Sequence, residues 1–317
     1  MKPTFSIGEA LAAPFRLARR RPVSLFLWGA IMTGIMVALY ALLVPAFANV
    51  PLGEGRGEEA VAEYMRQSQM SAVWLNAMTP LMYLAMLLVW TAAARATLSP
   101  GKGDRLAFLR VGMDEVRVAV VYVAWFLLWY VGLIVLVMIG FALGLTIWFI
   151  DQTIAIVVGV VFGLGVAVVA TWLWLRLSLI APATLILKAF AFAEGWALTR
   201  GQVWKLLGLN LLKWVISIPL MLGLYALVAA ILAGAFFGQG LTWPADAQTV
   251  ADLQPLFRAM LPAGAVALIP VAGFYGFYLA FSAAPSIVAA RQLLDGVPVP
   301  PAPIVADAAS GDGLEPA

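Results

Sequence analysis

Six apolar runs, each long enough to cross a lipid bilayer, constrain the fold of this chain more than any other feature of its sequence. A helix needs about 20 apolar residues to cross the hydrocarbon core. Within that core only helices and closed β-barrels pair all their backbone polar groups, and the alternating pattern of a β-barrel is absent. The sequence therefore predicts an all-α integral membrane protein with six transmembrane helices, at about 23–47, 73–94, 116–145, 154–175, 206–237 and 261–290.

The segments outside the spans differ from them in composition. Residues 1–22 join apolar side chains to three consecutive bases, Arg19, Arg20 and Arg21, which predicts an amphipathic helix lying on the cytoplasmic membrane surface. These three arginines are candidates for lipid or partner binding. Residues 23–295 contain the predicted six-helix membrane domain. Residues 296–317 are rich in Pro, Ala, Gly and Asp, and are predicted to form a disordered cytoplasmic tail.

The charged residues divide unequally between the two sides of the membrane. The connections at 48–72, 146–153 and 238–260 hold three arginines and seven acids, and the rest of the 19 bases fall on the other side. Because cytoplasmic loops carry an excess of Lys and Arg, the pattern places both termini in the cytoplasm. A basic cytoplasmic rim favours anionic lipid head groups. The bases are spread over helix ends, which does not indicate a nucleic-acid partner.

The connection between the fourth and fifth spans holds most of the candidate binding residues. It reads RLSLIAPATLILKAFAFAEGWALTRGQVWK over residues 176–205. On a helical spacing its apolar and charged side chains separate, which predicts an interfacial elbow between two spans. The functional alternative is that its bases converge on an anionic head group or an acidic partner. The candidates for lipid or partner binding are Arg176, Lys188, Trp196, Arg200, Trp204 and Lys205.

Two further candidates, Arg110 and Arg117, precede the third span in the stretch FLRVGMDEVRV. Asp114 lies four residues after the first and three before the second, so both can reach it on one helical face. The adjacent acids Asp114 and Glu115 point in different directions on a helix, which argues against a metal or acid–base pair. The pattern predicts a surface salt-bridge network.

Few polar side chains fall within the predicted spans. Lys213 lies about two turns past Lys205, and its long side chain is expected to extend to the membrane surface. No acid is placed deep in a span, which counts against a proton-coupled transporter. The spacings Gly140–Gly144 and Gly159–Gly163 favour close helix packing.

Three stretches share one amphipathic pattern: ALAAPFRLARRRPVSLFLW, DRLAFLRVGMDEVRVAVVY and AFAEGWALTRGQVWKLLGL. They align without gaps at Phe15, Leu109 and Trp196. The alignment predicts three repeated units, each an interfacial helix followed by a two-span hairpin, although shared amphipathicity alone gives a similar pattern.

The chain contains no cysteine and no histidine. It therefore lacks the thiolate nucleophile and the commonest general base and metal ligand. We expect no enzymatic activity, no metal and no cofactor.

The elbow motif resembles that of uncharacterised bacterial six-span proteins related to the membrane domain of glycerophosphoryl diester phosphodiesterases. The matching positions are Arg176, Ala181, Pro182, Trp196, Leu198, Thr199, Arg200, Gly201 and Trp204, and the opening FSIGEALAAPFRLARRRP is similar too. The resemblance implies a multi-pass protein of the bacterial inner membrane. Family members that cleave phosphodiesters carry a separate soluble catalytic barrel, so the resemblance brings no catalytic residue to this chain.

Two functions are consistent with these patterns. The first is a non-enzymatic membrane module that binds lipid head groups, partner membrane proteins or a second copy of itself through a basic cytoplasmic face. The alternative is a transporter or a flippase-like passage for an amphiphilic or lipid substrate, with a cavity between hairpins.

Overall fold

A computed structural model describes residues 4–47, 58–99, 107–244, 247 and 249–295. Over these residues the chain is helical and contains no β-strand. The predicted tail at 296–317 lies outside the described residues. The helices are α1 Ile7–Arg20, α2 Pro22–Phe47, α3 Glu58–Leu98, α4 Met113–Trp148, α5 Gln152–Leu177, α6 Ile180–Leu187, α7 Phe192–Leu198, α8 Val203–Gly238, the 3-10 helix η1 Val250–Leu253 and α9 Gln254–Leu294.

The all-α prediction is confirmed over the described residues. Six segments of the described chain are helical, long and apolar enough to cross a membrane, which supports a multi-pass membrane protein. Each predicted span falls within one helix, namely α2, α3, α4, α5, α8 and α9. Several helices extend beyond the predicted spans, and at the start of α5 a side-chain cap sets the end. Asp151 begins α5 by accepting a hydrogen bond from the Ile154 N–H at 3.0 Å.

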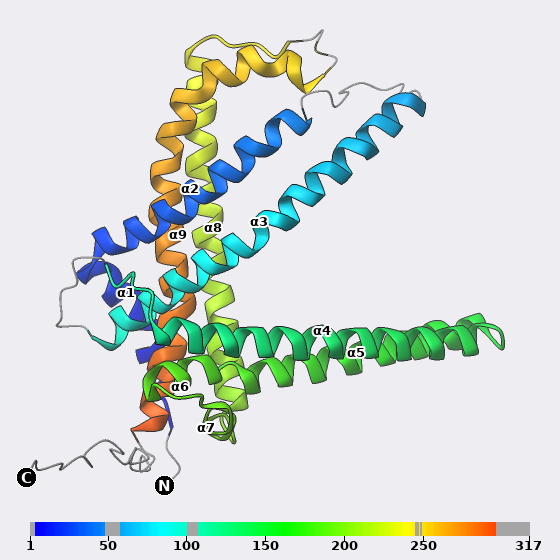
Figure 1. The fold of residues 1–317 in the computed structure, drawn as a ribbon, viewed down its shortest axis with the longest axis vertical. Helices are drawn as coiled ribbons and strands as arrows, with labels where there is room; N and C mark the ends of the chain where they lie inside the picture. The colour runs from blue at the N-terminus through cyan, green and yellow to red at the C-terminus, as the bar shows by residue number, and fades with distance from the viewer. Residues whose placement is uncertain (1–3, 48–57, 100–106, 245–246, 248, 296–317) are drawn as a thin grey trace, which may run out of the picture.

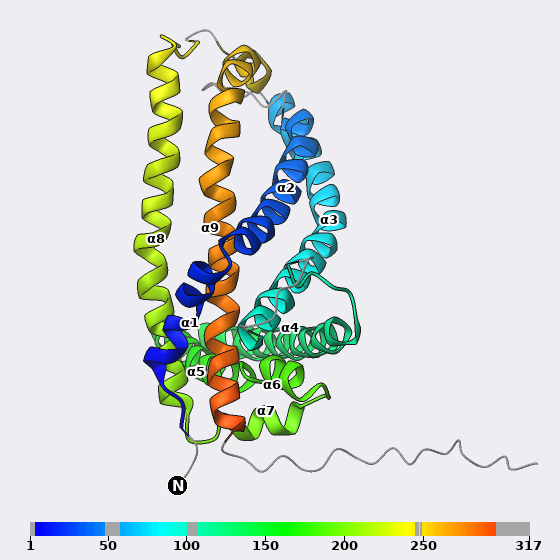
Figure 2. The same ribbon diagram turned by 90° about the vertical axis from the view of Figure 1, so that its left-hand side faces the viewer.

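The membrane helices form three pairs that diverge from one end of the molecule (Figure 1). We call this the basic end; α1, the start of α4, α6, α7, the start of α8 and the end of α9 lie there. From it α8 and α9 follow the long axis, α4 and α5 run together crosswise, and α2 and α3 slope between these two pairs. The perpendicular view shows α2 and α3 on one side of α9 and α8 on the other (Figure 2).

Helix α9 lies at the centre of the packing and contacts α1, α2, α3, α6, α7 and α8. Its crossing with α2 is a contact of backbone against backbone at Gly29 and Gly276. A Cβ atom on Gly29 would lie 2.6 Å from the Gly276 nitrogen, and one on Gly276 would overlap the Leu25 carbonyl oxygen. Only glycine on both helices allows them to approach this closely.

The glycine spacings singled out in the sequence do not have this role. An added Cβ at Gly144, Gly159 or Gly163 would meet nothing within 4 Å, and one at Gly140 would meet only the Phe162 ring. The expectation that these spacings bring helices close together is therefore wrong for Gly144, Gly159 and Gly163, whereas Gly140 leaves room for the Phe162 ring of α5. Their helices, α4 and α5, pack through larger side chains.

The three predicted repeat units differ in their described parts. Helix α1 has 14 residues and α7 has seven. In the second unit the aligned Leu109 follows Ala107 and Phe108, which adopt positive φ values of 50° and 64°, so residues 107–112 form a turn ahead of α4. The threefold repeat stays a prediction.

Candidate functional site

Arg176, near the end of α5, packs against the elbow between α5 and α8. Its guanidinium lies 5.3 Å from the Trp172 ring centre and 5.1 Å from that of Trp196. Its Nη1 donates to the Thr199 hydroxyl at 3.2 Å and to the Trp196 carbonyl at 3.4 Å. Stacking of a guanidinium on aromatic rings is favourable, and these contacts fix α7 against α5.

The other candidates of the elbow face outward. Arg200, Lys205 and Lys188 are exposed, and Trp204 is 83% exposed. The tight turn before α8 is formed by Gly201, at a φ of 82°. The structure thus joins Arg176 to Trp196 at a contact that is partly exposed, since Trp196 is itself 37% exposed. Convergence of the elbow bases on a head group stays a prediction.

The acids at the start of α4 belong to a partly buried cluster. The prediction that their salt-bridge network lies on the surface is therefore wrong. Glu115 is only 4% exposed and forms an ion pair with Arg95 of α3. It also accepts hydrogen bonds from the Thr91 hydroxyl at 3.1 Å and the Gly112 N–H at 2.9 Å. The expected pair of Arg117 with Asp114 is confirmed at 3.4 Å.

Arg95 is the centre of this cluster, and sequence reasoning missed it because it belongs to a different helix. It lies 3.5 Å from Asp114 and donates at 3.3 Å to the carbonyls of Phe108 and Arg110. The indole N–H of Trp28 holds the same loop through the Ala107 carbonyl at 2.9 Å. With so many internal partners, the cluster fastens α2, α3 and α4 together.

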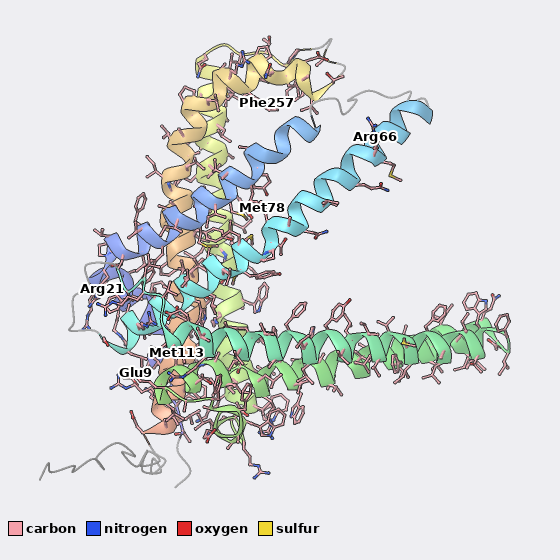
Figure 3. The ribbon with its side chains drawn as sticks, viewed as in Figure 1. Glu9, Arg21, Arg66, Met78, Met113 and Phe257 are labelled. Atoms are coloured by element: carbon pink, nitrogen blue, oxygen red, sulfur yellow. The ribbon has the colours of Figure 1, made fainter. Side chains whose placement is uncertain are left out.

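A cavity of about 360 Å³ lies between α1, the end of α3 and the end of α9. We call it the basic cavity. Its charged lining consists of four arginines and one aspartate: Arg16, Arg20, Arg21, Arg291 and Asp295. The labelled Arg21 and Glu9 mark this part of the molecule, whereas Arg66 and Phe257 lie at the opposite end (Figure 3).

Helix α1 presents one face to the basic cavity, formed by Ala13, Arg16, Leu17 and Arg20. These residues follow helical spacings of three and four. Gln292 of α9 fastens the start of α1, because its side-chain oxygen accepts from the Ser6 N–H at 2.8 Å and its amide donates to the Glu9 carboxylate.

The four arginines differ in the hydrogen bonds and ring contacts that their side chains make with the rest of the protein. Arg16 donates to the Glu9 carbonyl at 3.1 Å. Arg21 donates to the Ser99 carbonyl at 3.4 Å, and its guanidinium lies 4.6 Å from the centre of the Phe108 ring. The side chains of Arg20 and Arg291 have no hydrogen bond or ion pair within the described chain. A guanidinium offers five N–H donors in a planar fork that fits a phosphate or carboxylate.

The structure therefore places Arg20 and Arg21 at one cavity and leaves Arg19 exposed outside its lining. It adds Arg16 and Arg291, which the sequence analysis did not single out. The sequence does contain a pattern that could have identified Arg16, because Arg16 precedes Arg20 by one helical turn and so lies on the same face of α1. Arg291 is separated from α1 by most of the chain, so no local pattern brings the two together.

Comparison with protein-family models, curated proteins and solved structures finds no match to this chain. The family resemblance of the elbow motif thus stays a prediction. In the portion the structure describes, no three acidic side chains gather in a way that could hold a metal ion. The geometry of the cavities is the basis on which function is argued.

Proposed function

We propose that this chain is a membrane-embedded, non-enzymatic module that binds the phosphate of an anionic phospholipid in the basic cavity. The observation that supports the proposal is the set of four arginines around one cavity, two of them without a partner in the described chain. An arginine–phosphate pair can form two parallel charge-assisted hydrogen bonds, which are stronger than neutral ones. A single aspartate does not balance this charge.

The location of the basic cavity supports a lipid ligand. It lies where the apolar helices α3 and α9 end and where α1 packs against them. In the proposed orientation this end faces the cytoplasm and the chain belongs to the bacterial inner membrane, in agreement with the distribution of bases. Lipid phosphates would then lie at the same level as the arginines.

The proposal is tested by native mass spectrometry of the protein in nanodiscs that contain phosphatidylglycerol and phosphatidylcholine. We expect the wild-type protein to retain phosphatidylglycerol preferentially. The double variant Arg20→Gln/Arg291→Gln should lose this preference at least about tenfold, because each charge-assisted hydrogen bond is worth about 1.5–3 kcal/mol. The control, Arg66→Gln/Arg258→Gln, removes the same charge from exposed arginines outside the cavity.

Two results would contradict the proposal. If the control lowered phosphatidylglycerol retention as much as the cavity variant, the effect would be one of net charge. If inorganic phosphate at low millimolar concentration displaced the lipid, the cavity would be a site for a soluble anion.

A passage for an amphiphile is a second candidate function, favoured by the divergence of the α4–α5 pair from the α8–α9 pair (Figure 1). Such a passage needs an opening toward lipid between helices. Its test is a scrambling assay in proteoliposomes with a fluorescent lipid and a quencher that does not cross the membrane. Passage predicts quenching beyond the outer leaflet at a rate that rises with protein content.

A further inference from the structure

A second cavity, of about 370 Å³, lies where α3, α4, α5, α6, α8 and α9 meet. We call it the lysine cavity after Lys213 of α8, the one charged side chain in its described lining. It shares no lining residue with the basic cavity. The inference drawn from it is therefore independent of the proposed function.

Helix α9 separates the two cavities. Ser282 and Ser286, one turn apart, face the lysine cavity, whereas Ile287 and Arg291, also one turn apart, face the basic cavity. Successive residues on a helix point about 100° apart, so these are different faces of the same helix. The two sites can bind ligands separately.

In the polar part of the lysine cavity, the ammonium group of Lys213 has N–H donors that have no acceptor within the described chain. The Nζ of Lys213 donates to the Ser282 carbonyl at 3.2 Å, instead of extending to the membrane surface as the sequence predicted. A lysine ammonium has three donors, so this bond leaves two of them for a ligand. No acidic side chain belongs to the described lining to balance the charge.

Hydroxyl groups next to Lys213 can adapt to an anion. Ser282 and Ser286 donate to carbonyls three residues earlier in α9, at 2.7 and 2.8 Å. A hydroxyl hydrogen rotates to suit its surroundings, so either serine can turn its O–H toward a ligand oxygen. Together with the ammonium they provide donors on one side of the cavity.

The remaining wall is apolar and elongated. Val121, Trp125 and Leu128 are spaced by four and three residues, so they form one face of α4 along about 10 Å. Trp90 and Trp174 add two more aromatic rings. At about 30 Å³ for each water-sized group, 370 Å³ accommodates about a dozen non-hydrogen atoms, the size of one short hydrocarbon chain with its head group.

We propose that the lysine cavity binds a single-chain anionic amphiphile, with its carboxylate or phosphate at Lys213 and its hydrocarbon chain along α4. Lys213 lies ten residues into α8, about 15 Å from the start of that helix. A head group held there has left the surface of the membrane, so charge pairing with the ammonium is what offsets its loss of water. The apolar wall would favour an anion that carries a hydrocarbon chain over a small soluble anion.

The test is photo-crosslinking of a diazirine-bearing laurate to the full-length protein in phosphatidylcholine nanodiscs, with labelled peptides identified by mass spectrometry. We expect labelling of α4 near Trp125 and Leu128. Laurate or dodecyl phosphate should compete, and uncharged dodecanol should compete at least tenfold more weakly. The better competitor of the first two identifies the head group as carboxylate or phosphate.

Matched variants separate the charge of Lys213 from its packing. Lys213→Met should lower α4 labelling at least tenfold, and Lys213→Arg should restore most of it. Lys205→Met removes a lysine from the exposed part of the same helix and should change nothing. Leu128→Trp fills the cavity without touching the lysine and should also abolish labelling, which keeps the test valid if Lys213→Met unfolds.

Equal competition by dodecanol, or unchanged labelling of Lys213→Met, would overturn the proposal. So would labelling spread evenly over lipid-exposed surfaces. Phosphatidylglycerol retention by the basic cavity should be unchanged in the Lys213 variants, so failure of one proposal can be told from failure of the other.

Discussion

At the scale of single residues, the crossing of α2 and α9 requires glycine at one position in each helix, because there is no room for a side chain at either. Gly29 and Gly276 each bring the backbone of one helix into contact with that of the other. A methyl group at either position would overlap backbone atoms, and the backbone of a packed helix cannot turn aside as a flexible side chain can. These two glycines are therefore specific requirements of the fold.

We expect Gly276→Ala to lower the free energy of unfolding by about 3 kcal/mol, measured by thermal or denaturant unfolding in detergent. Gly264→Ala is the control in the same helix, since an added Cβ there meets nothing within 4 Å. It should be neutral or stabilise by up to about 1 kcal/mol through higher helix propensity. A similar loss in both variants would show that the close crossing is not the cause.

The ion pair between Arg95 and Glu115 is the second prediction at this scale. Glu115→Gln leaves the Arg95 charge with only Asp114 as its acidic partner among the described contacts, and should cost about 3 kcal/mol of stability. Asp114→Asn should cost less, because Asp114 is more exposed than Glu115. The measurement is again unfolding in detergent, and equal costs would contradict the central role of Glu115.

At the scale of elements, the short helix α7 is held by contacts rather than by its own length. Isolated helices this short are unstable in water. Gly195 allows α7 to approach α6, since a Cβ there would lie 2.6 Å from the Ile180 Cα, and Arg176 holds its far end through Trp196 and Thr199. The elbow thus has a defined shape.

Replacement of Arg176 by lysine tests this interpretation. A lysine keeps the charge but loses the planar group that stacks between the two rings. We expect Arg176→Lys to increase amide hydrogen exchange in residues 192–199 by about tenfold, whereas Arg200→Lys, at an exposed position, should leave it unchanged. Unchanged exchange in the first variant would show that the stacking does not hold the elbow.

The sequence predicts elements much better than contacts between them. All six long apolar helices could be located because the length of an apolar run is visible in the sequence itself. Arg176 was singled out by its position at a span end. Its partner Trp172 lies one turn earlier in α5, but its second partner, Trp196, comes from α7. Arg95, Arg291 and Gly276 were missed for the same reason: each acts through residues that are far away in the chain, and no local spacing encodes these pairings.

At the scale of the whole molecule, the divergent pairs can all cross one bilayer if they tilt. Helices α4 and α8 each have 36 residues, which corresponds to about 54 Å. At a tilt of about 40°, the upper end of the observed range, such a helix still spans about 41 Å and so exceeds the hydrocarbon core of about 30 Å. Figure 1 shows α4 and α5 crosswise to α8 and α9, with α2 and α3 sloping between them, so the two outer pairs must lean in opposite directions if all are to cross one bilayer.

Labelling of introduced cysteines tests this arrangement, and the chain has no cysteine of its own to interfere. With the basic end in the cytoplasm, Gln152→Cys and Gln239→Cys should react with an impermeant maleimide from outside spheroplasts. Lys205→Cys should react only after the membrane is permeabilised. If Gln152→Cys behaved like Lys205→Cys, the α4–α5 pair would lie along the membrane without crossing it.

The central place of α9 has a consequence for biosynthesis. The ribosome delivers α1, α2 and α3 first, yet the helix against which all three pack is made after every other described helix. Until α9 leaves the translocon, the close-contact surface around Gly29 has no partner and must be kept apart from wrong neighbours. We therefore expect assembly of this protein to be a late event, completed only when its last described helix enters the membrane.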